Sequence, residues 1–210
     1  MTTVQDLNIH VHHVTRVEGH GDIKVRTKSG KIEQCDLQIV ESPRFFESMI
    51  IGRRWKDVHH ITCRICGICS VGHTTASLGA TEAAFGLELT PQARLLRELI
   101  FHGEQLQSHI LHVYFLAAPD LLDVGSVVPL ATSHPDVVKR ALRLKKFANF
   151  ICEIVAGRHV HPISMWPGGF KHVPTKKQLV ELRRQLTEEV IPDLVETVDL
   201  IAALAPRLPK

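Results

Sequence analysis

Three of the five cysteines fall within seven residues, in the run Cys63-Arg-Ile-Cys66-Gly-Ile-Cys69, and His73 follows four residues later. Two thiolates separated by two residues can bind one metal ion, because the short loop between them turns both sulfurs the same way. Arg64 adds a permanent positive charge beside them, which favours the thiolate form. An odd cysteine count at this spacing argues against a framework of structural disulfides. The run therefore predicts metal or redox chemistry.

The spacing alone leaves the kind of metal open. Written as C-x2-C-x2-C-x3-H, the run is similar to a ferredoxin-type iron–sulfur site with a histidine in the fourth place. One C-x-x-C pair with His73 would instead form half of a zinc site. A zinc ribbon needs a second pair, and the remaining cysteines, Cys35 and Cys152, each stand alone. Cysteines also pack well as small apolar residues, but three within seven residues make that explanation the weaker one.

The composition is that of an ordinary globular protein. Of the 210 residues, 44% are hydrophobic and 22% are charged, which excludes disordered and fibrous chains. The net charge of +3 is small and scattered, so a nucleic-acid partner is not expected. No uninterrupted apolar stretch reaches the ~18 residues that a membrane helix needs. The N-terminus lacks the pattern of a signal peptide. We therefore expect a cytoplasmic protein with no membrane span.

Polar and apolar residues alternate along most of the first forty positions, a pattern typical of half-buried strands. The alternating stretches are 8–14, 22–28 and 31–40. Ser29 and Gly30 form a turn between the second and third stretch, and this arrangement predicts a hairpin. We expect a small antiparallel sheet over residues 1–41.

The rest of the chain has the period of helices. The predicted helices span about 42–52, 72–85, 91–118, 135–157 and 175–205. Pro119 is expected to end the longest of them, and Pro192 is expected to kink the last. The predicted fold class is mostly helical α+β: an N-terminal antiparallel β-hairpin layer followed, over residues 42–210, by a long-helix bundle.

Two local features refine this outline. On the longest helix, apolar or small residues recur at steps of four, three, four and three and predict its buried face: Leu99, Gly103, Leu106, Ile110 and Val113. The last helix opens with a capping box formed by Thr175 and Gln178. A loop at 159–170, rich in proline, glycine and aromatic residues, separates the last two predicted helices, and loops of this length are often functional.

The segment Arg64-Ile-Cys66-Gly-Ile-Cys69-Ser-Val-Gly-His73 matches R-x-C-G-x-C-x-x-x-H, the N-terminal metal signature of nickel–iron hydrogenase large subunits. The upstream run from Arg16 to Glu18, Gly19 and His20 resembles the R-[IV]-E-G-H motif of the same family. The two motifs stand in the family's order. The chain thus resembles the N-terminal half of such a large subunit.

Further segments carry the same resemblance. The run Arg44-Phe-Phe-Glu47 is similar to a segment with a third family position, and the stretch from His109 to Asp120 is similar to the family's long central helix. The RFFE form and the Trp-Pro-Gly-Gly-Phe loop most resemble the cytoplasmic branch that includes the methyl-viologen-reducing hydrogenases. The resemblance covers nearly the whole chain.

The resemblance implies roles for individual residues. Cys66 would be a terminal thiolate on nickel, and Cys69 would bridge nickel and iron. His73 would donate a hydrogen bond to the bridging sulfur, with Arg64 also beside the cofactor. Glu18 would carry away the proton that hydrogen cleavage leaves on a terminal thiolate.

Outside the nickel–iron centre, Glu47 would be a ligand of a separate magnesium or iron ion, for which a carboxylate is suited. Cys63 is not a ligand in the family pattern, and a packed thiol is the preferred interpretation. The cofactor would be a nickel–iron centre whose iron carries diatomic ligands. The activity implied is reversible oxidation of H2 to protons and electrons.

The chain departs from the family in one respect. The family's centre needs four thiolates, and the second pair belongs to a C-terminal D-P-C-x-x-C motif that these 210 residues do not contain. We expect another chain or segment to supply it, whether the large subunit is split or the sequence is a piece of a longer one. An iron–sulfur small subunit, together with further electron-transfer subunits, would complete the enzyme. The alternatives are an iron–sulfur or zinc module, or a metal-free structural relic in a redox complex.

Overall fold

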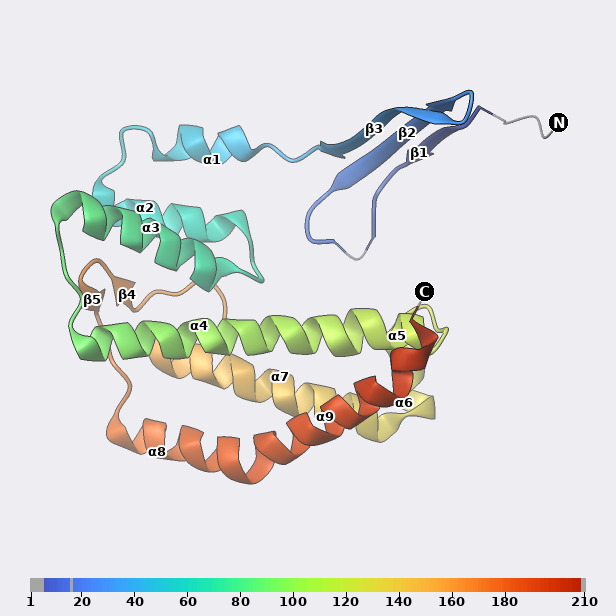
Figure 1. Cartoon of the computed structure of the whole chain (residues 1–210). Coiled ribbons are helices and arrows are strands. Elements are labelled where there is room, and N and C mark those ends of the chain that lie inside the picture. Colours follow the sequence, from blue (N-terminus) through green and yellow to red (C-terminus); the bar gives the residue numbers. More distant parts are fainter. Residues whose placement is uncertain (1–5, 16, 209–210) are drawn as a thin grey trace. The chain divides into compact units, whose positions relative to one another are not determined.

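The computed structural model describes residues 6–15 and 17–208. Its first elements are three strands, β1 (Asn8–Val11), β2 (Gly21–Lys28) and β3 (Lys31–Ile39), paired antiparallel in the order β1-β2-β3 (Figure 1). The predicted hairpin layer is confirmed. The first strand ends at Val11 rather than at residue 14, because His13 takes a left-handed backbone conformation with φ of 58° that does not continue a strand.

The sheet has one apolar and one polar face. The strand register places Ile9 opposite Val25, and Val25 opposite Cys35. The apolar face is uncovered at β3, where Leu37 is 65% exposed and Ile39 is 63% exposed.

The chain forms two compact units, residues 1–48 and 49–210. The first holds the sheet and the start of α1 (Pro43–Ile50), whereas the sequence placed the end of the β layer at residue 41. The second begins with α2 (Trp55–Thr62), a short 3₁₀ turn (Cys63–Ile65) and α3 (Ser70–Phe85). The sequence pattern did not predict α2, which has only eight residues, so that its helical period repeats only about twice.

The helix α4 (Pro91–Leu111) continues through a π-helical turn (His112–Ala117) into α5 (Ala118–Leu121). The expected stop before Pro119 is therefore wrong. In the π turn the backbone N–H of Ala118 donates to the carbonyl of Val113, five residues back. This wider turn accommodates a proline, which has no N–H to donate and would clash in a regular α-helix.

The remaining elements complete the second unit. They are α6 (Val127–Ser133), α7 (Pro135–Ala156), β4 (Met165–Trp166), β5 (Gly169–Phe170), α8 (Lys176–Gln185), a π turn (Leu186–Val190), α9 (Ile191–Leu204) and a 3₁₀ turn (Ala205–Arg207). The capping box at Thr175 and Gln178 is confirmed. Figure 1 shows the predicted bend, which lies at the π turn just before Pro192. No helix in the described ranges is long and apolar enough to cross a bilayer.

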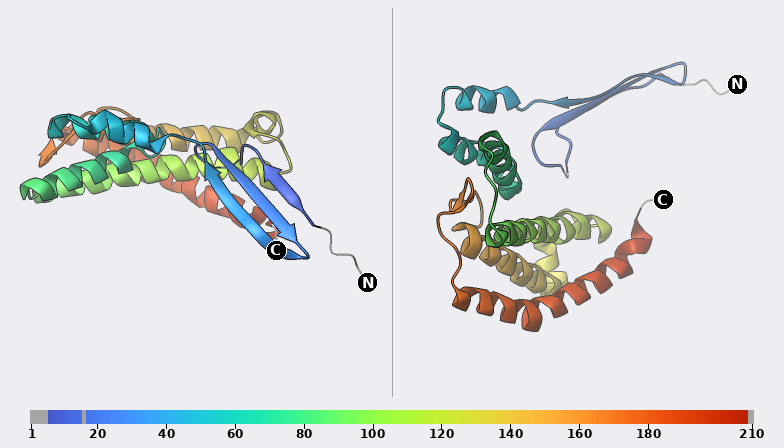
Figure 2. Two further views of the ribbon diagram at one scale, coloured as in Figure 1. Left: turned by 90° about the horizontal axis from the view of Figure 1, so that it is seen from above. Right: turned by 60° about the vertical axis from the view of Figure 1, so that its left-hand side comes forward.

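The hydrophobic core lies between α4 and α7, which run side by side in both views of Figure 2. The predicted face of α4 is only partly right. Gly103 and Ile110 are buried, but Leu99 and Leu106 are only partly buried at its edge. The buried side of α4 is shifted by about one residue from the predicted face. It also includes three polar residues, which a search for apolar residues does not find: Arg97, Glu104 and Gln107.

The close approach of α4 to α7 depends on Gly103. A Cβ atom there would lie 2.9 Å from Cγ2 of Ile151 and 3.2 Å from Sγ of Cys152. Both neighbours are buried side chains of α7, so neither can move aside without cost.

We predict that Gly103→Ala lowers the free energy of unfolding of the chain by about 1–3 kcal/mol, because overpacking outweighs the helix propensity gained. Urea unfolding measures the change. Gly79→Ala is the matched control, since Gly79 is exposed in α3 and a Cβ there meets open space. This control should gain up to about 1 kcal/mol. A stabilised Gly103→Ala variant would contradict the packing described.

Candidate metal centre

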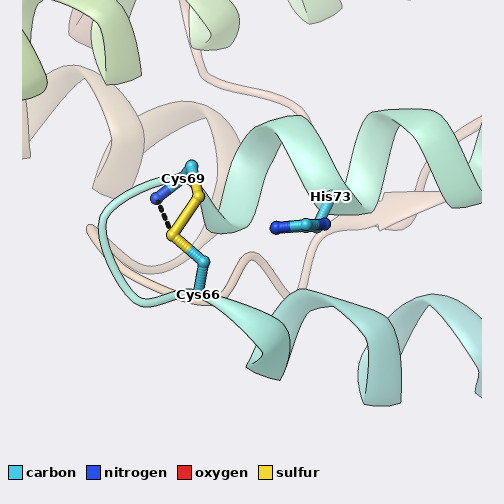
Figure 3. Close-up of side chains that lie close together, drawn as sticks. All are labelled: Cys66, Cys69 and His73. Carbon is cyan, nitrogen blue, oxygen red and sulfur yellow. Dashed lines mark hydrogen bonds between the residues drawn. A yellow bond between two sulfur atoms is a disulfide. The ribbon is translucent and has the colours of Figure 1, made fainter. Parts of the chain in front are cut away.

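The C-x-x-C loop joins the 3₁₀ turn to α3 and brings three ligand-type side chains together. The sulfur atoms of Cys66 and Cys69 and a ring nitrogen of His73 all lie within 4.8 Å of one another. Figure 3 shows the His73 ring extending from α3 on the side of the two cysteines. The backbone N–H of Cys69 donates to Sγ of Cys66 over 3.0 Å. Two sulfurs and one imidazole nitrogen form a donor set suited to a soft or borderline transition metal.

Cys66 and Cys69 are joined as a disulfide in this structure. The cysteine count and spacing argued only against a framework of structural cross-links, and they did not predict this bond. The reason is local: a loop of two residues holds both sulfurs on one side, which suits a disulfide as well as a shared ion. Binding a metal requires the reduced pair, because only a thiolate is a ligand.

The structure places Cys63 apart from this cluster. Its side chain is buried, and its Sγ–H donates to the carbonyl of His60 over 3.3 Å. Burial raises the pKa of the Cys63 thiol, and the charge of neighbouring Arg64 only partly opposes the shift. Cys63 is therefore a protonated, packed thiol at neutral pH. Arg64 itself is exposed.

A buried carboxylate that the sequence analysis did not single out anchors the start of α3. The side chain of Cys69, the residue before α3, caps nothing. Instead, Glu104 of α4 accepts hydrogen bonds from the backbone N–H groups of Val71 (2.5 Å) and Gly72 (2.9 Å). A carboxylate is well placed there, because the first N–H groups of a helix have no partner within it and carry partial positive charge. Glu104 thereby sets the position of the helix that carries His73.

The loop that follows α7 holds the other side of the cysteine loop. The backbone N–H of His161 donates to Oγ of Ser70 (2.9 Å), and its Nδ1 lies 3.0 Å from the carbonyl of Cys63. The long 159–170 loop thus packs against the segment that carries the cysteines.

A buried ion pair also binds the backbone of the 159–170 loop. Arg97 of α4 makes two hydrogen bonds to the carboxylate of Glu82 in α3, and it also donates to the carbonyl of Trp166. The backbone N–H of Gly168 donates to Glu82 over 2.7 Å. Both charged side chains are about 8% exposed, and pairing compensates for the loss of water.

A neutral histidine lies under this loop. His59 of α2 is 1% exposed, and its ring meets Trp166 edge to face at 5.4 Å. Burial, with a smaller effect from the neighbouring charge of His60, lowers the pKa of His59 to about 4. His59 is therefore uncharged at neutral pH and packs as an aromatic ring.

The two predicted glutamates belong to the other compact unit. Glu18 is exposed in the connection between β1 and β2, and Glu47 is exposed on α1. Arg16, which opens the first motif, lies outside the described residues. The structure thus brings together Cys66, Cys69 and His73, and it describes the two glutamates only within residues 1–48.

Comparison with known proteins decides which family this site belongs to. A model described as nickel-dependent hydrogenase matches residues 44–140, and a HoxL-like model matches residues 8–42. The chain belongs to the nickel-dependent hydrogenase family. It matches the N-terminal region of the family's large subunit, and the three clustered ligands lie within the matched residues.

Individual relatives support the assignment. The alpha chain of sulfhydrogenase 2 from Pyrococcus furiosus is 38% identical over 83% of this chain and 42% of its own. An F420-non-reducing hydrogenase chain of Methanothermobacter marburgensis is 37% identical over 91% of this chain and 44% of its own. The crystal structure of an NAD+-reducing [NiFe]-hydrogenase in the H2-reduced state superposes with a TM-score of 0.84 at 31% identity, over 94% of this chain and 46% of that one. The match covers less than half the length of each of these relatives.

Glu104 left a signal in the sequence that could have been used. It lies seven residues after Arg97 and three before Gln107, on the same side of α4. An amphipathic helix would carry apolar residues on that side. Polar residues on a core face need partners, so they point to a buried network. The sequence does not show which backbone groups those partners are.

We predict that Glu104→Ala lowers the free energy of unfolding of the chain by about 3 kcal/mol, because two buried N–H groups lose a charged acceptor. Glu104→Gln should cost less, since it keeps one acceptor. Hydrogen exchange at Val71 and Gly72 and urea unfolding measure both effects. Glu98→Ala, at an exposed position of α4, is the control and should change neither. Unaltered exchange at the two amides in Glu104→Ala would refute this role.

Proposed function

We propose that this chain is the N-terminal half of the large subunit of a cytoplasmic nickel–iron hydrogenase, similar to the methyl-viologen-reducing type, which catalyses reversible oxidation of H2. The observation that carries the proposal is the gathering of Cys66, Cys69 and His73 within residues matched by the nickel-dependent hydrogenase model. Several relatives named F420-non-reducing hydrogenase support the choice of branch.

The donor set fits the metals of such a centre. In the reduced chain the thiolates of Cys66 and Cys69 would hold this centre. A nickel–iron centre, when bound, supplies the place where the H–H bond is split. His73 would donate a hydrogen bond to the sulfur of Cys69, and Arg64 would contribute positive charge nearby.

Two thiolates hold half of the centre. The remaining pair would come from another chain or segment that carries the D-P-C-x-x-C motif. The match covers only 42% and 44% of the Pyrococcus furiosus and Methanothermobacter marburgensis relatives, which supports such a source. So does the uncovered apolar face of the N-terminal sheet, because an apolar surface of this kind is stabilised by burial against a partner.

The remaining assignments concern proton transfer, a second metal ion and electron transfer. Glu18 would accept the proton released at the terminal thiolate, and Glu47 would bind a separate magnesium or iron ion. An iron–sulfur small subunit would take the electrons and pass them to further electron-transfer subunits.

The first test is the metal content of the complex purified anaerobically from its native source. We expect close to one nickel per chain, and the loss of that nickel in Cys66→Ser and in Cys69→Ser, because each removes a thiolate ligand. Cys35→Ser and Cys63→Ser are the matched controls and should keep nickel. Iron without nickel, lost in Cys63→Ser as well, would favour an iron–sulfur module. The absence of both metals would favour a structural relic.

The second test separates proton transfer from metal binding. Glu18→Gln should retain nickel but lower H2/D2O exchange by at least about 100-fold, because the amide cannot accept the proton. Glu33→Gln changes an exposed carboxylate on β3 of the same unit and should leave the exchange rate unchanged. Normal exchange in Glu18→Gln would exclude Glu18 as the proton carrier.

A further inference from the structure

Imidazoles surround one carboxylate on the polar face of the N-terminal sheet. Nε2 of His10 lies 3.6 Å and Nδ1 of His12 lies 3.5 Å from Oδ2 of Asp22. Nε2 of His20 lies 3.6 Å from the other oxygen, Oδ1. The ligand atoms of His10, His12 and Asp22 all lie within 4.8 Å of one another. This group is separate from every residue assigned to the nickel–iron centre.

The strand register explains how these side chains meet. Val11 pairs with Ile23, so His10 stands on the opposite face of β1 from Val11, and Asp22 stands on the opposite face of β2 from Ile23. Both therefore point to the polar side. His12 is the first residue after β1, where the chain enters the 12–20 connection, and its Nδ1 also reaches Asp22.

The distances suit a shared ion better than hydrogen bonds. Imidazole-to-carboxylate hydrogen bonds are about 2.7–3.2 Å long, and the two contacts of Asp22 Oδ2 with His10 and His12 both exceed that range. Two ligands on one tetrahedral ion, each bonded at about 2.0–2.1 Å, lie about 3.4 Å apart. The observed 3.5 and 3.6 Å are close to this separation.

The carboxylate is charged and held in place. The backbone N–H of His13 donates to Oδ1 of Asp22 over 3.2 Å. This hydrogen bond is the main cause that holds the pKa of Asp22 below its ordinary value, and the nearby imidazoles add to the shift. Lys24 brings a cation beside the group, since it pairs with His10 in the register, and it also pairs with Asp36 on its other side.

We propose that His10, His12 and Asp22 form a second metal site, which binds a borderline divalent transition ion such as Zn2+ through His10 Nε2, His12 Nδ1 and Asp22 Oδ2, with water completing the coordination. Two imidazoles and a carboxylate are a ligand set that such ions prefer. The backbone N–H of His13 holds the second carboxylate oxygen. His20 lies beside the same oxygen at 3.6 Å and is not one of the proposed ligands. The ion would join β1 to β2. The site lies wholly within residues 6–48, so it stands or fails independently of the proposed hydrogenase function.

The test is a Zn2+ titration of the full chain against a chromophoric chelator. The chain carries Cys66→Ser and Cys69→Ser, so that these thiolates do not compete for the ion. We expect one Zn2+ per chain, with affinity at least about 100-fold weaker when His10→Ala and His12→Ala are added. His20→Ala should weaken binding far less than this, because His20 is not one of the three proposed ligands.

The matched control is His134→Ala with His172→Ala, which removes two exposed histidines of the other unit and should leave the affinity unchanged. Zn2+ binding that is absent from the chain lacking Cys66 and Cys69, or unaffected by the His10 and His12 changes, would overturn the proposal.

A second measurement avoids the cysteine substitutions. In the chain with native cysteines, nuclear magnetic resonance of the ring nitrogens should show Zn2+ shifting Nε2 of His10 and Nδ1 of His12. Shifts confined to His73 would overturn the proposal. Ring-nitrogen identity is a readout that a purely structural role of these histidines would not produce.

Discussion

One buried carboxylate, that of Glu104, fixes the position of the segment that carries Cys66, Cys69 and His73. The C-x-x-C loop ends where α3 begins, and the exposed N–H groups of that helix start would be costly to bury without acceptors. Glu104 reaches across from α4 and accepts two of these bonds. The same helix α4 packs against α7 through Gly103, whose lack of a side chain permits the close approach. The orientation of His73 and of the cysteine pair is thereby tied to the helical core rather than to a flexible loop.

Polar interactions inside the second unit make this connection rigid. The Arg97–Glu82 pair joins α4 to α3 and to the loop that follows α7, and His161 of that loop bonds to Ser70 at the start of α3. Buried charges and amides are stable only when nearly all of their hydrogen bonds are made, so the network allows few alternative arrangements. A site that has to present thiolates to a metal benefits from such rigidity.

The N-terminal unit is organised differently. Its sheet has an apolar face, which is exposed at β3, and a polar face, on which His10, His12 and Asp22 lie close together. A three-stranded sheet with one open apolar face gains little stability from its own burial. A bound ion that joins β1 to β2 would stabilise the folded sheet by mass action. In these proposals the apolar face packs against a partner, and the polar face binds an ion.

The sequence alone was enough for the elements with strong local signals. Alternation predicted the hairpin, the helix predicted over 72–85 ends at the same residue as α3, and the Thr175 capping box marked the start of α8, because caps and turns are interactions between near neighbours. The C-x-x-C spacing with His73 was likewise sufficient to find the candidate metal ligands. What only the tertiary structure decided depends on contacts between residues far apart in the chain: the π turn that carries the helix past Pro119, the partners of Glu104, and the meeting of His10 with Asp22. Local patterns cannot specify such pairs, since the partner of a buried polar group or a cross-strand ligand is set by packing and register.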